Sequence, residues 1–108
     1  MPVLVTMRVK VYDFGGTKRA AAKYAEKMKT LGCHWLRIYR SESNPNYILW
    51  LMEWESRDAF ESLGSVVEED INSLVNPVGN WEEVIWAFRM RCRWRSRDFT
   101  SPVSQLCI

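Results

Sequence analysis

The beginning of the chain alternates between apolar and mixed positions with a period of two. Apolar side chains recur at every second position from 3 to 11, at Val3, Val5, Met7, Val9 and Val11. This alternation predicts a strand with one apolar face. Two further alternating segments, 33–40 and 47–55, flank a polar turn over 41–46 and predict a hairpin of two strands.

Two segments have helical spacing instead. We expect Thr17 to cap a helix that Gly32 ends, with apolar positions three or four residues apart. These positions are Ala21, Tyr24, Ala25, Met28 and Leu31. We expect Ser56 to cap a second helical region, which Gly64 divides. The Asn-Pro-Val-Gly-Asn run at 76–80 stops this region, and a last strand is predicted from residue 81 or 82.

The last alternating segment is unusually long. Its apolar face carries Val84, Trp86, Phe88, Met90, Cys92 and Trp94, and its other face carries Arg89, Arg91, Arg93, Arg95 and Arg97. Strands typically run about 5 to 6 residues, so we expect a second copy of the chain to cover the overhang. In the alternative, the strand stops near residue 92 and the arginines form a solvated tail. Residues 96–108 lack periodicity and are expected to be loosely held.

The predicted order is strand, helix, strand, strand, helix, strand. This βαββαβ order is typical of a ferredoxin-like α+β fold, an antiparallel four-stranded sheet with its helices on one face. We expect the strands to lie in the order fourth, first, third, second. The length of 108 residues suits one domain. We place that domain at 1–95 and a tail at 96–108.

The formal net charge of +2 conceals three blocks of charge. Residues 1–40 hold nine basic and two acidic side chains, 41–83 one basic and ten acidic, and 84–108 five basic and one acidic. Blocks of opposite sign in one domain usually neutralise each other, and the chain carries no known nucleic-acid-binding motif. We therefore do not expect nucleic acid as a partner, although an anionic partner of the arginine-rich strand stays a third hypothesis.

The sequence also argues against membrane, secreted, disulfide-rich and metal-binding proteins. No run approaches the roughly 18 apolar residues of a membrane helix, and the first residues lack the features of a signal peptide, so we expect a cytoplasmic protein without a membrane partner. Cys33, Cys92 and Cys107 lack CxxC spacing and accompany a single histidine. This pattern indicates neither a disulfide framework nor a metal site.

Aromatic and thioether side chains recur on two predicted strand faces, which carry Ile48, Trp50, Met52 and Trp54, and Trp86, Phe88 and Met90. We expect both faces to line the space between sheet and helices. There they form either a pocket for a planar apolar ligand or a core filled with tryptophan. The opposite faces carry Arg8, Lys10, Arg37, Tyr39, Glu53, Glu55, Arg89 and Arg91. With the acidic third strand between the basic first and second strands, these side chains predict cross-strand ion pairs.

Three short stretches carry a family resemblance. They are Leu-Gly-Cys at 31–33, Leu-Arg-Ile-Tyr-Arg-Ser at 36–41 with Asn-Pro at 44–45, and Glu-Trp-Glu-Ser-Arg-Asp-Ala-Phe at 53–60. In these stretches the chain resembles the dimeric α+β barrel superfamily, in particular the antibiotic biosynthesis monooxygenase (ABM) domain. The resemblance covers residues 1 to about 92 and implies a homodimer.

Haem-degrading members of this superfamily use an asparagine, a tryptophan and an iron-ligating histidine. The matching positions here hold Met7, Leu63 and Asn72, so the resemblance does not imply haem degradation.

Cofactor-independent, quinone-forming members share a tryptophan with this chain, at Trp54. Their asparagine four residues earlier is Trp50 here, and their tyrosine and arginine fall on Phe60 and about Leu74. The tryptophan is therefore present without its polar partners.

The resemblance implies a small cofactor-independent enzyme, monooxygenase-like or isomerase- or cyclase-like, acting on a hydrophobic aromatic or polyketide-like substrate. The candidate catalytic residues are Trp54, Tyr39, Arg37 and His34. The candidate substrate-binding residues are Trp50, Met52, Phe60, Trp86, Phe88 and Met90. We expect neither a metal nor another cofactor. The alternative is a noncatalytic dimeric ligand-binding or stress-associated protein on the same fold.

Overall fold

The computed structural model describes residues 1–87 and the backbone of 92–93 and 106–107. Its elements are β1 (Val3–Val11), α1 (Gly15–Leu31), β2 (Cys33–Arg40), β3 (Tyr47–Trp54), α2 (Arg57–Glu61), α3 (Ser65–Val75) and β4 (Pro77–Trp86). Two short strands, β5 (Cys92–Arg93) and β6 (Leu106–Cys107), pair antiparallel with each other.

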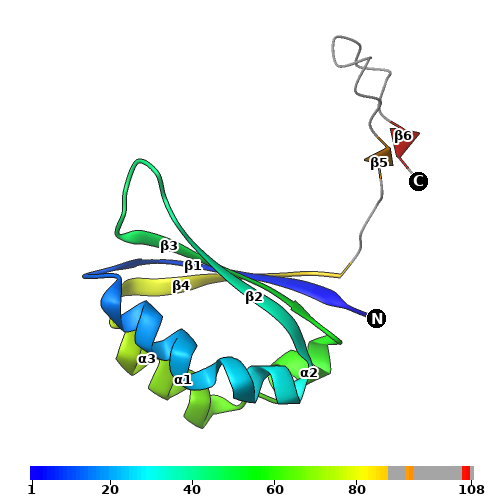
Figure 1. The fold of residues 1–108 in the computed structure, drawn as a ribbon, viewed down its shortest axis with the longest axis horizontal. Helices are drawn as coiled ribbons and strands as arrows, with labels where there is room; N and C mark the ends of the chain where they lie inside the picture. The colour runs from blue at the N-terminus through cyan, green and yellow to red at the C-terminus, as the bar shows by residue number, and fades with distance from the viewer. Residues whose placement is uncertain (88–91, 94–105, 108) are drawn as a thin grey trace.

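The four long strands form one antiparallel sheet in the order β2-β3-β1-β4. The three helices of residues 1–87 all lie on one face of this sheet (Figure 1). The predicted ferredoxin-like α+β fold and the predicted strand order are therefore confirmed. No helix in residues 1–87 has the length and apolar character needed to cross a membrane.

The core lies between the sheet and the helices. Alternate side chains of β1 and β3 are buried there, as the period of two predicts. Each large apolar side chain that is fully buried contributes roughly 1.5–3 kcal/mol to folding, before the opposing entropy is counted. The buried strand residues are Val3, Val5, Val9, Val11, Ile48, Trp50, Met52 and Trp54.

The opposite sheet face carries no helix, and we call it the outer face. It includes Leu4, Thr6 and Arg8 of β1, Trp35, Arg37 and Tyr39 of β2, Leu49, Leu51 and Glu53 of β3, and Glu82, Val84 and Trp86 of β4.

Local signals fix most helix ends. The Ser56 hydroxyl accepts a hydrogen bond of 3.0 Å from the Ala59 amide, which confirms the predicted cap of α2. Gly64, with φ of 84°, divides α2 from α3, and Gly32, with φ of 117°, ends α1. Both predictions hold.

The predicted start of the first helix is wrong. Helix α1 begins at Gly15, where the Asp13 carboxylate accepts a hydrogen bond of 2.8 Å from the Gly15 amide. Because this carboxylate already binds an amide of the first turn, Thr17 is not needed as a cap. Thr17 instead lies in the first turn of α1, and its side chain is fully buried.

The last strand also differs from the prediction, because β4 begins at Pro77 rather than at residue 81 or 82. Asn76, with φ of 53°, ends α3 directly before it. The register with β1 then shifts, since Arg8 pairs with Glu82 while Lys10 pairs with Val78. The strand can therefore start early and still align with β1 beyond the irregularity.

The predicted continuation of this strand past Trp86 reaches Phe88, Met90, Trp94 and the alternating arginines at 89, 91, 95 and 97. All of these lie outside the described residues. The domain boundary at residue 95 and the loosely held tail therefore stay predictions.

Candidate functional site

A cavity of about 440 Å³ lies between the sheet and the two shorter helices, α2 and α3. Neighbouring strands supply a row of side chains to it, because Met7 of β1 pairs with Trp50 of β3 on one side and Glu83 of β4 on the other. Most of the remaining wall is apolar. The apolar lining residues are Met7, Met28, Trp50, Met52, Phe60, Leu63, Ile71 and Trp81.

Two tryptophans form an aromatic corner of this cavity. The rings of Trp50 and Trp81 meet edge to face, with centroids 6.1 Å apart and an interplanar angle of 86°. The Trp81 indole N–H donates a hydrogen bond of 2.8 Å to Asn72 Oδ1. Because Asn72 belongs to α3 and Trp81 to β4, this bond ties the helix to the sheet edge and holds the corner in place.

Carboxylates line the same cavity. Glu68 and Glu69 come from α3, and Glu83 comes from β4. Burial raises the pKa of Glu83, and the neighbouring Glu68 raises it further, while Arg57 opposes the shift. A carboxyl group beside an apolar wall, with its pKa raised by desolvation, is a candidate for proton transfer.

A second hollow of about 450 Å³ adjoins the cavity and shares Phe60, Glu68 and Glu83 with it. Its remaining wall includes Arg57 and Glu61, whose Nε and Oε1 atoms lie 2.9 Å apart. Within the described residues, no group of three or more His, Cys, Asp or Glu side chains is arranged to hold a metal ion.

Two of the buried indoles have unpaired N–H groups. Trp50 and Trp54 are 2% and 0% exposed, and among the described residues no acceptor lies within hydrogen-bond reach of either Nε1 atom. An unpaired buried donor costs about 1–3 kcal/mol. Trp50 lines the cavity, whereas Trp54 packs edge to face on Phe60 with ring centroids 5.5 Å apart.

The structure brings three of the predicted substrate-binding residues together. Trp50, Met52 and Phe60 all line the cavity, as their positions on β3 and α2 predict. Phe88 and Met90 lie outside the described residues.

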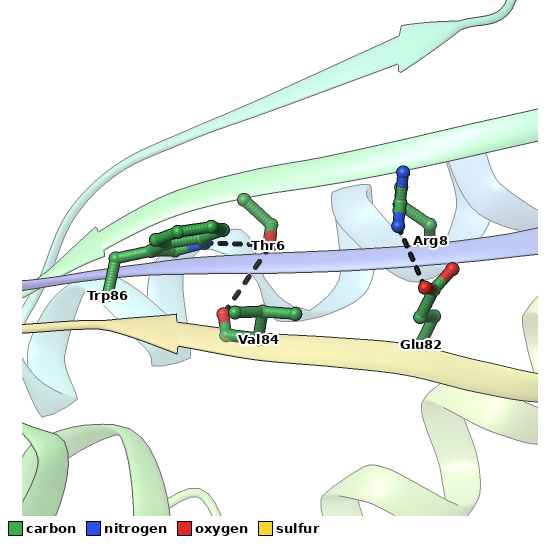
Figure 2. Close-up of polar contacts among 5 residues, drawn as sticks. All are labelled: Thr6, Arg8, Glu82, Val84 and Trp86. Carbon is green, nitrogen blue, oxygen red and sulfur yellow. Dashed lines mark hydrogen bonds and ion pairs between the residues drawn. The ribbon is translucent and has the colours of Figure 1, made fainter.

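The expectation that Trp86 faces the helices is wrong. Val5, which is fully buried against the helices, pairs with Ile85, so the next pair, Leu4 and Trp86, faces the other way. Trp86 is 53% exposed on the outer face. Its indole N–H donates a bond of 3.2 Å to Thr6 Oγ1, which donates in turn to the Val84 carbonyl (Figure 2).

The predicted catalytic residues do not meet in the cavity. Trp54 is packed behind Phe60, while Arg37 and Tyr39 lie on the outer face of β2. The Arg37 guanidinium sits 4.6 Å from the centre of the Trp35 ring. His34 stands at the register shift of β2, where its Nδ1 lies 2.9 Å from Glu53 Oε1. None of the four is among the residues that line the cavity.

The predicted ion pairs of the third strand are corrected for the first strand, whereas the third strand does pair with the second through Glu53 and His34. Arg8 lies opposite Leu49, so β3 offers it no carboxylate. Arg8 instead pairs with Glu82 of β4 at 2.8 Å (Figure 2), and Glu53 pairs with His34.

The polar part of this cavity was not predicted from the sequence. Glu83, Glu68, Asn72 and Trp81 were not among the predicted site residues. The doublet Glu82-Glu83 carried a usable signal, because adjacent positions on a strand face opposite sides and one of these carboxylates had to face the helices.

Comparison with known proteins identifies the fold. No protein-family model matches the sequence, and no curated protein matches it significantly. Among solved structures, the chain is similar to SnoaB, a cofactor-independent oxygenase from Streptomyces nogalater. The TM-score is 0.68 at 16% identity, over 82% of this chain and 93% of SnoaB.

Two further structures lead to the same group. One is an antibiotic biosynthesis monooxygenase, with a TM-score of 0.65 at 13% identity over 81% of this chain and 98% of that one. The other is a Bordetella bronchiseptica protein assigned to the same monooxygenases, with a TM-score of 0.67 at 15% identity over 82% and 97%. At these identities the likeness concerns the fold alone, and this chain has the fold of the antibiotic biosynthesis monooxygenases.

Proposed function

We propose that the protein is a small cofactor-independent oxygenase that acts on a hydrophobic aromatic substrate in the cavity between the sheet and α3. The observation that carries this proposal is an aromatic cavity of about 440 Å³ with a carboxyl group in its wall, Glu83, whose pKa is raised by desolvation. SnoaB, a cofactor-independent oxygenase of similar fold, supports the same class of chemistry.

The cavity suits a planar substrate. The perpendicular rings of Trp50 and Trp81 form an aromatic corner in its wall, and Met7 and Met52 adapt to the outline of a ligand. An apolar wall with a few polar groups is typical of sites for small organic ligands. A polyketide-like tricyclic ring with an acidic methylene group is the substrate class that we infer.

Glu83 acts as the general base in this proposal. Its carboxylate takes one proton from a methylene group flanked by aromatic rings, which leaves a resonance-stabilised carbanion. A raised pKa favours this step, because the stronger base has the larger driving force for proton transfer.

Molecular oxygen is the oxidant. The carbanion transfers one electron to oxygen, and the radical pair combines to form a carbon–oxygen bond. The resulting peroxide anion takes the proton back from Glu83 and becomes a hydroperoxide, which loses water as the second methylene hydrogen leaves and the carbonyl forms. One oxygen atom ends in the ketone and the other in water, so no cofactor is consumed.

We also propose that two copies of the chain associate through the outer face. That face is largely apolar and has no helix over it, and Tyr39 and Trp86 are 47% and 53% exposed there. It also carries both signs of charge, in Arg8 and Glu82, so a two-fold interface between identical surfaces can match opposite charges. The homodimer expected from the family resemblance fits this face.

Sedimentation velocity at micromolar concentration tests the dimer. Wild type should sediment as a dimer and Trp86→Glu as a monomer, because a buried unpaired carboxylate is costly. The control is Val66→Glu, at a side chain on α3 that is 79% exposed. It should stay dimeric. A monomeric wild type, or a dimeric Trp86→Glu, refutes the proposed interface.

Oxygen uptake with anthrone tests the proposed activity. At neutral pH the wild-type protein should consume one oxygen molecule for each anthraquinone formed. Glu83→Gln should lower kcat by about 100-fold or more, the usual contribution of a general base. Glu26→Gln, at an exposed carboxylate on α1, is the matched control and should retain full activity.

The results with anthrone distinguish an oxygenase from a noncatalytic ligand-binding protein. Anthrone binding without oxygen uptake would favour the alternative, a noncatalytic ligand-binding protein on the same fold. Full activity in Glu83→Gln would remove Glu83 from the mechanism.

A further inference from the structure

Trp81 is a half-buried residue that lies between the interior of the cavity and the solvent. On its inner side, its ring meets the ring of Trp50 edge to face, and Trp50 is only 2% exposed. On its outer side, its indole N–H donates the hydrogen bond to Asn72, a residue on the exposed side of α3. Trp81 and Asn72 both line the cavity, so their bond joins β4 to α3 across its wall.

The strand segment that carries Trp81 is irregular. Residues 79–81 of β4 lie opposite Val9 of β1 alone, because the register between the two strands shifts there. Gly79 has φ of 92°, and no described atom lies within 4 Å of where its Cβ would be. A bulge that contains an open glycine can adjust more easily than a regularly paired strand. The position of the Trp81 ring therefore depends on its contacts with Trp50 and Asn72.

The bond between Trp81 and Asn72 is weak enough to open and close. A single hydrogen bond between neutral groups in contact with water changes an equilibrium by about 2- to 10-fold. Loss of this bond should therefore raise the fraction of molecules with a displaced Trp81 ring by a similar factor. The aromatic contact with Trp50 still favours the observed position.

We propose that Trp81 is a gate of the cavity, held closed by Asn72. In the closed position the ring lies against Trp50, and in the open position an aromatic ligand passes between β4 and α3. Asn72 is a positioning residue, because it acts on the ligand through Trp81. A gate of this kind also limits the access of water while a ligand is bound. This inference rests on the proposed function in taking the cavity as the substrate site, and it adds the two residues that control access to that site.

Stopped-flow binding of 9-(hydroxymethyl)anthracene tests the gate. The fluorescence of the anthracene ring, excited directly, reports binding in every variant. Because a ligand passes the gate on entry and on exit, both rate constants are proportional to the open fraction. Asn72→Ala should therefore raise the association and dissociation rate constants together, by about 2- to 10-fold, and leave Kd unchanged. A residue that only forms part of the wall would change the dissociation rate constant and Kd instead.

Matched variants isolate the hydrogen bond. Asn72→Asp keeps an acceptor oxygen for the indole N–H and should keep the wild-type rate constants. Ser73→Ala changes the next residue of α3, which is also exposed, and is the control. Trp81→Phe keeps an aromatic ring but has no N–H, so it should resemble Asn72→Ala. The double variant should be no faster than either single variant, because both changes remove the same bond.

A second readout needs no ligand. Two indoles in edge-to-face contact couple electronically and give a characteristic band in far-UV circular dichroism. The band of the Trp50–Trp81 pair should be absent from Trp81→Phe and reduced in Asn72→Ala. It should be unchanged in Asn72→Asp and in Ser73→Ala. A full band in Asn72→Ala would show that Asn72 does not position Trp81.

The possible results distinguish the gate from the oxygenase. Unchanged rate constants in Asn72→Ala, a rise in the dissociation rate constant alone, or no binding of the anthracene by wild type would overturn the gate. Rate constants that rise together in a protein that consumes no oxygen support the gate and refute the oxygenase. Oxygen uptake that requires Glu83, with rate constants independent of Asn72, does the reverse.

Discussion

Helix α1 meets α3 at a glycine that leaves no room for a side chain. A Cβ atom at Gly16 would lie 2.0 Å from the backbone oxygen of Leu74, and Cβ atoms essentially never approach closer than 3.0 Å. In Gly16→Ala the two helices must therefore separate by about 1 Å at this point. Because α3 also forms one wall of the cavity, the separation would disturb the candidate site as well.

The cost of this substitution follows from two opposing effects. Overpacking costs about 1–3 kcal/mol, and the upper end applies because a backbone carbonyl cannot rotate away as a side chain can. Alanine returns up to about 1 kcal/mol through its higher helix propensity. We expect a net loss of about 2 kcal/mol, which corresponds to a fall in Tm of roughly 8–16 °C for a domain of this size.

Urea and thermal unfolding followed by far-UV circular dichroism measure this loss. The matched control is Gly15→Ala, one residue earlier, where the new Cβ would meet only the side chains of Asp13 and Arg19, at 3.0 and 3.2 Å. That variant should lie within about 0.5 kcal/mol of wild type, because only the ends of two flexible side chains must move, by a few tenths of an ångström. A Gly16→Ala protein as stable as Gly15→Ala would refute the close packing of α1 on α3.

Three further predictions concern the cap and two carboxylates. Ser56→Ala should lose about 1 kcal/mol in urea unfolding and Ser56→Asp should keep most of it, since either oxygen caps α2; equal losses would contradict the cap. Asp70 accepts hydrogen bonds from Lys23 and Tyr24, which lower its pKa from 3.8. Asp70→Asn should therefore be less stable than wild type above pH 4, with the gap closing as the pH falls further; a gap independent of pH would contradict this. The pKa of Glu83 is raised above 4.5 in the folded protein. Wild type should therefore lose stability relative to Glu83→Gln as the pH rises from about 4.5 through this raised pKa. Parallel pH profiles of the two proteins would contradict the shift.

The fold was predictable because local patterns decide most of it. Alternation defined the first three strands, the polar turn at 41–46 defined the hairpin, and Ser56 and Gly64 marked the start and the division of the second helical region. The strand order followed from the order of elements. The start of α1 was misplaced because Asp13, rather than Thr17, supplies the oxygen that binds its first amide.

Which side chains of β4 face the helices could not be predicted from the residues of β4 alone. Val84 and Trp86 have the composition of a core face, and Glu83 has that of a solvent face. Pairing with β1 decides the outcome, because Val5 is buried and lies opposite Ile85. The same pairing moves Trp86 to the outer face and brings Glu83 to the cavity.

The candidate site was therefore predicted in its apolar half only. Trp50, Met52 and Phe60 were found because large apolar side chains in a strand or helix of this pattern belong to the core. Glu83 was missed because a single carboxylate on a strand is ordinarily solvated, and its desolvation depends on its place in the cavity that β4 and α3 line together.

The central claim is that the cavity beside Trp50, Trp81 and Glu83 is where the substrate binds and reacts. A crystal structure with anthrone bound in the absence of oxygen tests it most directly. The claim predicts the tricyclic ring against Trp50 and Trp81, with its methylene carbon close enough to the Glu83 carboxylate for direct proton transfer. A ring bound on the outer face beside Trp86, with the cavity unchanged, would contradict it.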